Sequence, residues 1–199
     1  MARRRPPAGA HRRPRPLGAA AVVRIIAGRW KGRRLKPPAG RLVRPTTDRV
    51  REAWMSALGG SLDGLRVLDL FAGSGALGLE ALSRGAEHVV FVERARASFR
   101  VLEANVELLD AGGSVTLIHD DVFRWLRGVE AGRFDLALAD PPYGTGDATR
   151  LAEAFRSTPF ARELWLEHAW REALPTRPGE RTRRYGDTAL TTLLSGPEP

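Results

Sequence analysis

The sequence contains no cysteine, and this absence excludes several kinds of chemistry. A disulfide-stabilised fold, thiolate catalysis and cysteine-ligated zinc all require this residue. Histidine is also scarce: four residues are scattered without metal-ligand spacing, so we predict no metal site. No apolar run approaches the roughly 20 residues of a membrane span, and the apolar patch at 17–23 is too weak for a secretory signal. We therefore expect a cytoplasmic protein that does not bind membranes.

Acidic residues are missing from the first 47 positions, which contain 14 Lys and Arg residues. The rest of the chain holds 18 basic residues and all 23 acidic ones, a net charge of −5. This asymmetry predicts a basic arm on an acidic body, and the natural partner of such an arm is nucleic acid. A solvated tail without a partner is the alternative. Codon bias also contributes to the charge, since arginine outnumbers lysine 30 to 2.

The chain divides into three parts by composition. Residues 1–21 are a low-complexity mixture of Arg, Pro, Ala and Gly, which predicts a disordered basic tail. Residues 22–60 predict a small basic β-hairpin and a linking helix, which begins at a Thr N-cap and ends at two glycines. Residues 61–199 are long enough for a single α/β domain, which we expect to be the catalytic one.

Within residues 61–199, short apolar runs alternate with amphipathic stretches, and this order is typical of a doubly wound, mostly parallel sheet. The last two β-like segments are joined by Gly186-Asp187 and predict antiparallel strands at the C-terminal end of the sheet. The predicted strands are 66–70, 88–93, 115–119, 134–139, 163–168, 180–186 and 188–194, and the predicted helices are 76–84, 95–109, 121–127 and 147–156.

A glycine-rich loop, Gly73-Ser-Gly-Ala-Leu-Gly78, follows the first predicted strand of this domain. Such a loop lets the backbone approach a ligand closely, and both dinucleotides and methyl donors use one. Asp69 lies four residues before Gly73. A carboxylate there would repel a pyrophosphate but attract the amino group of a methionine moiety. The loop therefore predicts a methyl donor rather than a dinucleotide, with a plain strand-helix turn as the alternative.

Two more acidic residues follow the next strands. Glu93 ends the second strand, where an acid commonly accepts hydrogen bonds from ribose hydroxyls. This position fits both kinds of ligand, and a solvated charge at a strand end is the other interpretation. Asp121 follows the third strand and could face an adenine amino group, although its neighbour Asp120 is a rival for that role.

The sequence Asp140-Pro-Pro-Tyr143 follows the apolar run 134–139. We predict that this corner is catalytic and acts on an exocyclic amine. The Asp140 carboxylate and a backbone carbonyl of Pro141 or Pro142 would accept the two amine hydrogens, and Tyr143 would stack on the base. Methyl transfer would then depend mainly on positioning. A proline-rich turn with a capping Asp is the alternative interpretation.

These motifs resemble those of the S-adenosylmethionine-dependent amino methyltransferases. The closer similarity is to the RsmD-type 16S rRNA guanine-N2 methyltransferases, and it covers roughly residues 23–195. The glycine loop and the Asp140 corner are shared widely among methyltransferases, whereas Arg44-Pro-Thr-Thr-Asp-Arg-Val-Arg-Glu-Ala53 is specific to this family. The hairpin Arg24–Leu35 and the C-terminal Arg184–Leu190 are also similar to segments of the family. The tail before Val22 departs from the pattern.

The resemblance implies a Rossmann-like class I methyltransferase fold and activity on one guanine of 16S rRNA. The substrate would be a 30S subunit or an assembly intermediate, and the enzyme a monomer. S-adenosylmethionine would lie near Asp69, Phe71, Gly73, Gly75, Glu93 and Asp121, and the catalytic residues would be Asp140, Pro141, Pro142 and Tyr143. RNA would contact Arg24, Arg29, Lys31, Arg33, Arg34, Arg44 and Arg49.

Three other functions stay open at this point. An adenine-N6 methyltransferase can use the same kind of corner, but the chain has no spare length for a DNA target-recognition domain. A protein-glutamine methyltransferase usually has Asn rather than Asp at the first position of the corner. A non-catalytic RNA-binding assembly factor could keep the fold, but the intact glycine loop and corner argue against it.

Overall fold

A computed structural model describes residues 23–37, 46–59 and 61–196, without the side chains of 46–51. The predictions for the tail at 1–21, for Arg44 and for the side chain of Arg49 lie outside the described residues.

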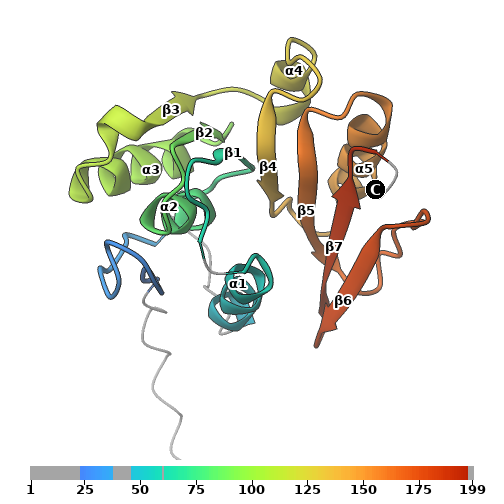
Figure 1. Ribbon diagram of the computed structural model, residues 1–199, viewed down its shortest axis with the longest axis horizontal. Helices are drawn as coiled ribbons and strands as arrows, with labels where there is room; N and C mark the ends of the chain where they lie inside the picture. The colour runs from blue at the N-terminus through green and yellow to red at the C-terminus, as the bar shows by residue number, and fades with distance from the viewer. Residues whose placement is uncertain (1–22, 38–45, 60, 197–199) are drawn as a thin grey trace, which may run out of the picture.

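The described part of the chain is built around a seven-stranded sheet with the order β3-β2-β1-β4-β5-β7-β6 (Figure 1). The first five strands in this order are parallel to one another. The strand β7 pairs antiparallel with both of its neighbours, β5 and β6. The predicted mostly parallel sheet with antiparallel C-terminal strands is therefore confirmed. The strands are β1 (Arg66–Leu70), β2 (His88–Val92), β3 (Val115–Ile118), β4 (Phe134–Ala139), β5 (Ala161–Ala169), β6 (Arg181–Tyr185) and β7 (Thr188–Leu194).

Helices cover both faces of the sheet, α1 to α3 on one face and α4 and α5 on the other (Figure 1). Neighbouring residues of a strand point to opposite faces, so Val67 joins one core cluster and Leu68 the other. None of the described helices is long and apolar enough to cross a membrane. The helices are α1 (Thr46–Ala57), α2 (Ala76–Ser83), α3 (Arg96–Leu108), α4 (Val122–Leu126) and α5 (Asp147–Ser157), with a 3₁₀ turn at Gly112–Ser114.

The N-terminal hairpin is present, but its strand pairing is confined to one antiparallel bridge between Arg24 and Arg34. The Ile25 N–H donates to the Arg33 carbonyl at 2.9 Å, and the Leu35 N–H donates to the Val23 carbonyl at 2.8 Å. Val23, Ile25 and Leu35 are buried in the core shared with α1 to α3. Packing of these apolar residues therefore holds the hairpin more than a long ladder does.

Glu80 fixes the hairpin to α2. Its fully buried carboxylate accepts hydrogen bonds from the N–H groups of Ile26 and Ala27, at 2.6 and 3.0 Å, and from Arg84 Nε at 2.8 Å. A charge in this position is tolerated because it is paired and hydrogen-bonded. Gly28 lies so close to α2 that an added Cβ would be 1.6 Å from the Ser83 carbonyl oxygen. The hairpin is therefore docked on α2 rather than extended from it.

Asn105 of α3 links the end of the hairpin to the glycine loop. Its fully buried side-chain amide donates to the carbonyl of Lys36 at 3.0 Å and to that of Ser74 at 2.9 Å. Its side-chain oxygen accepts the Lys36 N–H at 2.8 Å. One side chain thus ties the hairpin to the loop between β1 and α2.

Candidate functional site

The carboxyl ends of β1, β2 and β4 meet at one edge of the sheet. Leu70 at the end of β1 lies between its partners Val92 of β2 and Ala139 of β4. The residues that follow these strands are the start of the glycine loop, Glu93 and Asp140. In parallel α/β sheets ligands bind at this edge, so the fold brings the predicted donor-binding and catalytic segments together.

The three glycines of the loop are suited to their positions for different physical reasons. Gly75 (φ 80°) and Gly73 (φ 59°) both adopt left-handed backbone conformations. A Cβ on Gly75 would lie 2.4 Å from a methyl group of Leu102, and a Cβ on Gly78 would lie 2.4 Å from the ring of Phe91. A Cβ on Gly73 would meet only the Phe71 carbonyl, at 3.9 Å. Gly75 and Gly78 are therefore needed for internal packing, and Gly73 is on the open side.

Phe71 is one of two non-glycine residues with positive φ in the described part of the chain. Its φ of 56° is unfavourable for an aromatic residue, and such strain is common at functional sites. The ring is half-buried and packs edge-on against Phe123, with 6.0 Å between ring centroids. The left-handed backbone conformation of Phe71 changes the direction of the chain where β1 ends.

Two acidic side chains hold the glycine loop through its backbone. Asp69 is 1% exposed and accepts the Gly78 N–H at 2.9 Å. Glu93 is buried and accepts the N–H groups of Gly73 and Ala95 at 2.8 and 2.6 Å. Both carboxylates therefore also have a structural role.

The electrostatics of this edge favour a cation. Burial raises the pKa of Asp69 well above its usual range, and the charges of Asp140 and Glu93 raise it further, while the hydrogen bond from Gly78 opposes them. Asp140 and Glu93 are thus both close enough to act on Asp69. Within the described residues, no group of three His, Cys, Asp or Glu side chains could hold a metal ion. The charge arrangement at this edge suits a cationic ligand.

Asp121 is the N-cap of α4, and its carboxylate accepts the N–H groups of Phe123 and Arg124, both at 3.0 Å. Arg94 lies 3.8 Å from the same carboxylate. The rival Asp120 instead forms an ion pair with Arg124, and this hydrogen bond lowers the pKa of Asp120. Asp121 therefore caps the helix α4, whereas Asp120 pairs with an arginine side chain.

The corner after β4 is held by hydrogen bonds from other elements. Asp140 and Tyr143 are half-buried and Pro141 is buried. The Tyr143 hydroxyl donates to Glu167 at 2.7 Å and lies 3.0 Å from the hydroxyl oxygen of Thr188. Burial raises the pKa of Tyr143, and the neighbouring Glu167 carboxylate raises it further. Tyr143 therefore stays a neutral hydrogen-bond donor, and its ring is fixed at the far end.

All five predicted RNA-contacting residues of the described hairpin have exposed side chains. The Arg33 guanidinium donates to the Leu108 carbonyl at 2.9 Å, and the Arg29 guanidinium lies 3.8 Å from the ring centroid of Trp30. The apolar residues of the hairpin face the core, so the basic ones face outward. The five residues are Arg24, Arg29, Lys31, Arg33 and Arg34.

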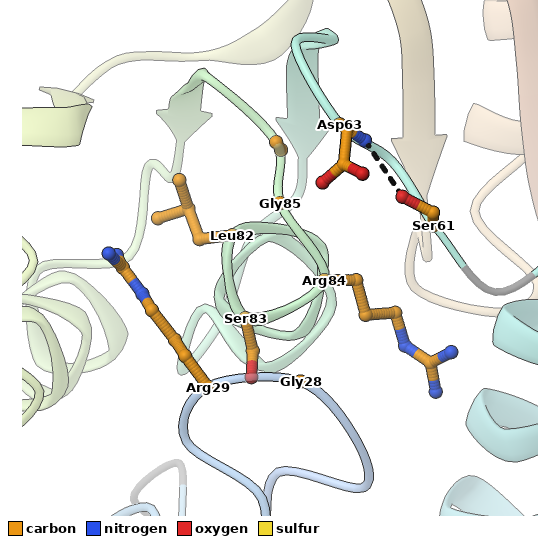
Figure 2. Close-up of a pocket in the computed structure, with 9 residues that line it drawn as sticks. Gly28, Arg29, Ser61, Asp63, Leu82, Ser83, Arg84 and Gly85 are labelled. Carbon is orange, nitrogen blue, oxygen red and sulfur yellow. Dashed lines mark hydrogen bonds between the residues drawn. The ribbon is translucent and has the colours of Figure 1, made fainter.

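A cavity of about 470 Å³ lies between the hairpin and the C-terminal end of α2 (Figure 2). Ser83 points toward the hairpin, whereas Arg29 and Arg84 extend to different sides of the helix (Figure 2). The cavity is also lined by Ser61, Asp63 and Gly85, which precede β1 and β2. It therefore lies at the sheet edge opposite the glycine loop. The cavity therefore does not coincide with the predicted donor site.

Four residues important for this arrangement were missed by sequence reasoning: Glu80, Asn105, Glu167 and Thr188. Glu80 and Glu167 do carry a signal, because each is an acid inside an otherwise apolar segment. Asn105 is a polar residue on the buried face of α3. The partners of these residues depend on tertiary contacts, which no local pattern shows.

A family model described as conserved hypothetical protein 95 matches residues 23–192. Ribosomal RNA small subunit methyltransferase D of Escherichia coli (strain K12) is 34% identical over 159 residues, 78% of this chain and 79% of that protein. YlbH of Bacillus subtilis (strain 168) is 44% identical over 124 residues, 61% of this chain and 67% of that protein.

Solved structures show the same fold. The structure of yhhF from Escherichia coli has a TM-score of 0.75 and 30% identity, and the match covers 88% of this chain and 100% of the yhhF chain. The 16S rRNA N2 methyltransferase RsmC of T. thermophilus, in complex with AdoMet and guanosine, has a TM-score of 0.60 and 28% identity, covering 79% of this chain and 44% of RsmC. The RsmD-type resemblance is confirmed, and this chain belongs to the family of conserved hypothetical protein 95, together with the RsmD-type methyltransferases.

Proposed function

We propose that this protein transfers a methyl group from S-adenosylmethionine to the exocyclic N2 of a guanine in 16S rRNA. The observation that carries the proposal is the convergence of Asp69, Glu93 and Asp140 at one sheet edge, beside a left-handed glycine turn and the fixed ring of Tyr143. The named activity of the Escherichia coli relative, and the guanosine bound to RsmC, support the substrate.

The residues present fit the methyl donor. S-adenosylmethionine would supply an electrophilic methyl group on a sulfonium, and it also carries an ammonium group. Asp69 would balance the ammonium charge, while Gly73 leaves open space for close approach to the loop. Glu93 would bind the ribose. Because Asp120 is paired with Arg124, Asp121 is the better candidate for the adenine amino group.

Asp140 and a proline carbonyl would orient the target amine. The lone pair of an exocyclic amine is delocalised into the ring, and two acceptors for its hydrogens favour a more nucleophilic geometry. The Pro142 carbonyl already accepts the Thr145 hydroxyl at 2.8 Å, so the Pro141 carbonyl is the better second acceptor. Tyr143 would stack on the base. These groups fit an adenine amine as well, and the choice of guanine rests on the similarity to the 16S rRNA N2 methyltransferase RsmC.

Asp140→Ala is expected to abolish methyl transfer while leaving donor affinity within a few-fold, because the substitution removes an acceptor for the amine but no proposed donor contact. Transfer is measured with radiolabelled S-adenosylmethionine on small subunits from a strain lacking the protein, and the modified base is located by mass spectrometry. Donor affinity is measured by calorimetry. Retained turnover would contradict the role of Asp140, and absence of donor binding by the unmodified protein would contradict the proposed function.

Tyr143→Phe is expected to lower kcat about fivefold, because loss of one hydrogen bond costs about 1 kcal/mol and frees the ring. Glu167→Gln should have a smaller effect in the unmodified protein and none in the Tyr143→Phe background, since Glu167 acts through the hydroxyl. Single-turnover kinetics of the two variants and their combination check this. Additive losses would show that Glu167 acts independently of Tyr143.

Donor affinity is expected to fall as the pH is lowered through the raised pKa of Asp69. The pKa of Asp69 is raised in the free protein, and a bound cation would lower it. Protonation therefore competes with binding, and affinity recovers as the pH rises through the pKa of the free protein. Calorimetry over this range measures the effect, with Asp69→Asn as the control that should abolish it. A pH-independent affinity would place the cation elsewhere.

Neutralising the exposed arginines of the hairpin is expected to weaken binding to small subunits. Each lost phosphate contact should reduce the salt slope by about 1. The measurement is affinity at several salt concentrations, and a slope unchanged from that of the unmodified protein would mean that the hairpin only packs on the domain. The variant carries Gln at Arg24, Arg29, Arg33 and Arg34, and the control carries the same charge change at Arg100, Arg127, Arg133 and Arg162, which are also exposed.

A further inference from the structure

We propose that Trp170 and Arg184 form a platform on which an unpaired RNA base stacks, at the same sheet edge as the target nucleotide. This Trp170–Arg184 platform rests on the proposed function and adds a second RNA contact, separate from the hairpin. Its residues follow the end of β5 and lie near the end of β6, next to the turn that leads into β7. Figure 1 shows that these three strands form one side of the sheet.

Trp170 presents a large aromatic surface to solvent. It is 41% exposed, and among the described residues the one other large exposed hydrophobic side chain is Leu108, at 40%. The Arg184 guanidinium lies 4.8 Å from the Trp170 ring centroid. Single exposed apolar residues are common, but an exposed ring paired with a guanidinium is the arrangement that binds bases in single-stranded nucleic acid.

Hydrogen bonds hold both members of the platform in place. The backbone N–H of Trp170 donates to the Asp187 carbonyl at 2.8 Å, and Arg184 Nε donates to the Gly186 carbonyl at 2.8 Å. The turn between β6 and β7 therefore fixes the strand end that carries Trp170 and also orients Arg184. A base that stacks there would meet a surface that needs little ordering.

The platform lies at the same edge of the sheet as the catalytic corner. Trp170 follows Ala169, which pairs with Thr188, and the Thr188 hydroxyl contacts the Tyr143 hydroxyl at 3.0 Å. Because neighbouring residues of a strand point to opposite faces, Trp170 and Arg184 belong to the face opposite Thr188. An RNA strand that passes over this edge from Tyr143 would therefore reach Trp170 on the other face.

The charge around the platform favours RNA over a protein partner. The strand β6 has three arginines and no acid, and its residues Arg181 to Arg184 are exposed. Glu180, just before the strand, is paired with Arg156 at 2.5 Å. Asp187 in the adjoining turn is also exposed, but the arginines outnumber it. A ring beside several arginines suits a base next to its phosphates.

The test is a fluorescence and affinity titration of the full chain with a short unstructured oligoribonucleotide of mixed sequence. Trp170→Ala should weaken binding about 5- to 100-fold, as removal of a stacking ring does, and Trp170→Phe should give an intermediate loss. Leu108→Ala removes an equally exposed apolar side chain on α3. It should leave binding unchanged, because Arg33 contacts the backbone carbonyl of Leu108 and not its side chain. Arg184→Ala should weaken binding more than Arg183→Ala, because neighbouring residues of β6 point to opposite faces.

Methylation kinetics separate this proposal from the proposed function. Trp170→Ala should raise KM for RNA and leave kcat within a few-fold. If Trp170→Ala and Leu108→Ala behave alike while the unmodified protein methylates RNA, the platform is wrong and the proposed function stands. If Trp170→Ala loses binding to small subunits but not to the oligoribonucleotide, the ring contacts a protein and the proposal is overturned. If the unmodified protein neither binds nor methylates RNA, the proposed function itself fails.

Discussion

The parallel register of β1 with β2 and β4 is the constraint on which the candidate site depends. Because Leu70 is paired with Val92 and with Ala139, the acids near these strand ends are forced to share one edge. Burial and the neighbouring carboxylates disfavour the charged state of Asp69. Hydrogen bonds from backbone N–H groups to Asp69 and Glu93 stabilise the charged forms of these side chains. In the proposed function, the carboxylates at this edge would attract the cationic donor.

Hydrogen bonds of Asn105 connect the hairpin directly to the glycine loop. A displacement of Lys36 would break the hydrogen bonds to Asn105, whose amide also holds the Ser74 carbonyl. Leaving such a buried group unsatisfied costs about 1–3 kcal/mol. The basic surface and the loop are therefore held in a fixed relation, which suits an enzyme whose substrate is much larger than the reacting base.

Much of the fold could be predicted because its signals are local. The alternation of apolar runs with amphipathic helices placed each strand and helix of the main domain within about two residues. The glycine spacing likewise marked the turn after β1. The hairpin was less predictable, because Gly28 and Gly32 mark its turns but do not show that pairing stops at one bridge. Burial of Val23, Ile25 and Leu35 against other elements replaces the missing ladder.

The contacts of Tyr143 could not be predicted from local patterns, since Glu167 and Thr188 lie 24 and 45 residues further along the chain. Their meeting depends on the insertion of β7 between β5 and β6. Because β7 runs antiparallel to β5, its first residue, rather than its last, lies at the carboxyl edge of the parallel strands. The same reversal brings the turn before β7 to that edge, next to Trp170. In the proposed function, this strand direction, which plays no part in donor binding, would thereby form one wall of the site for the target base.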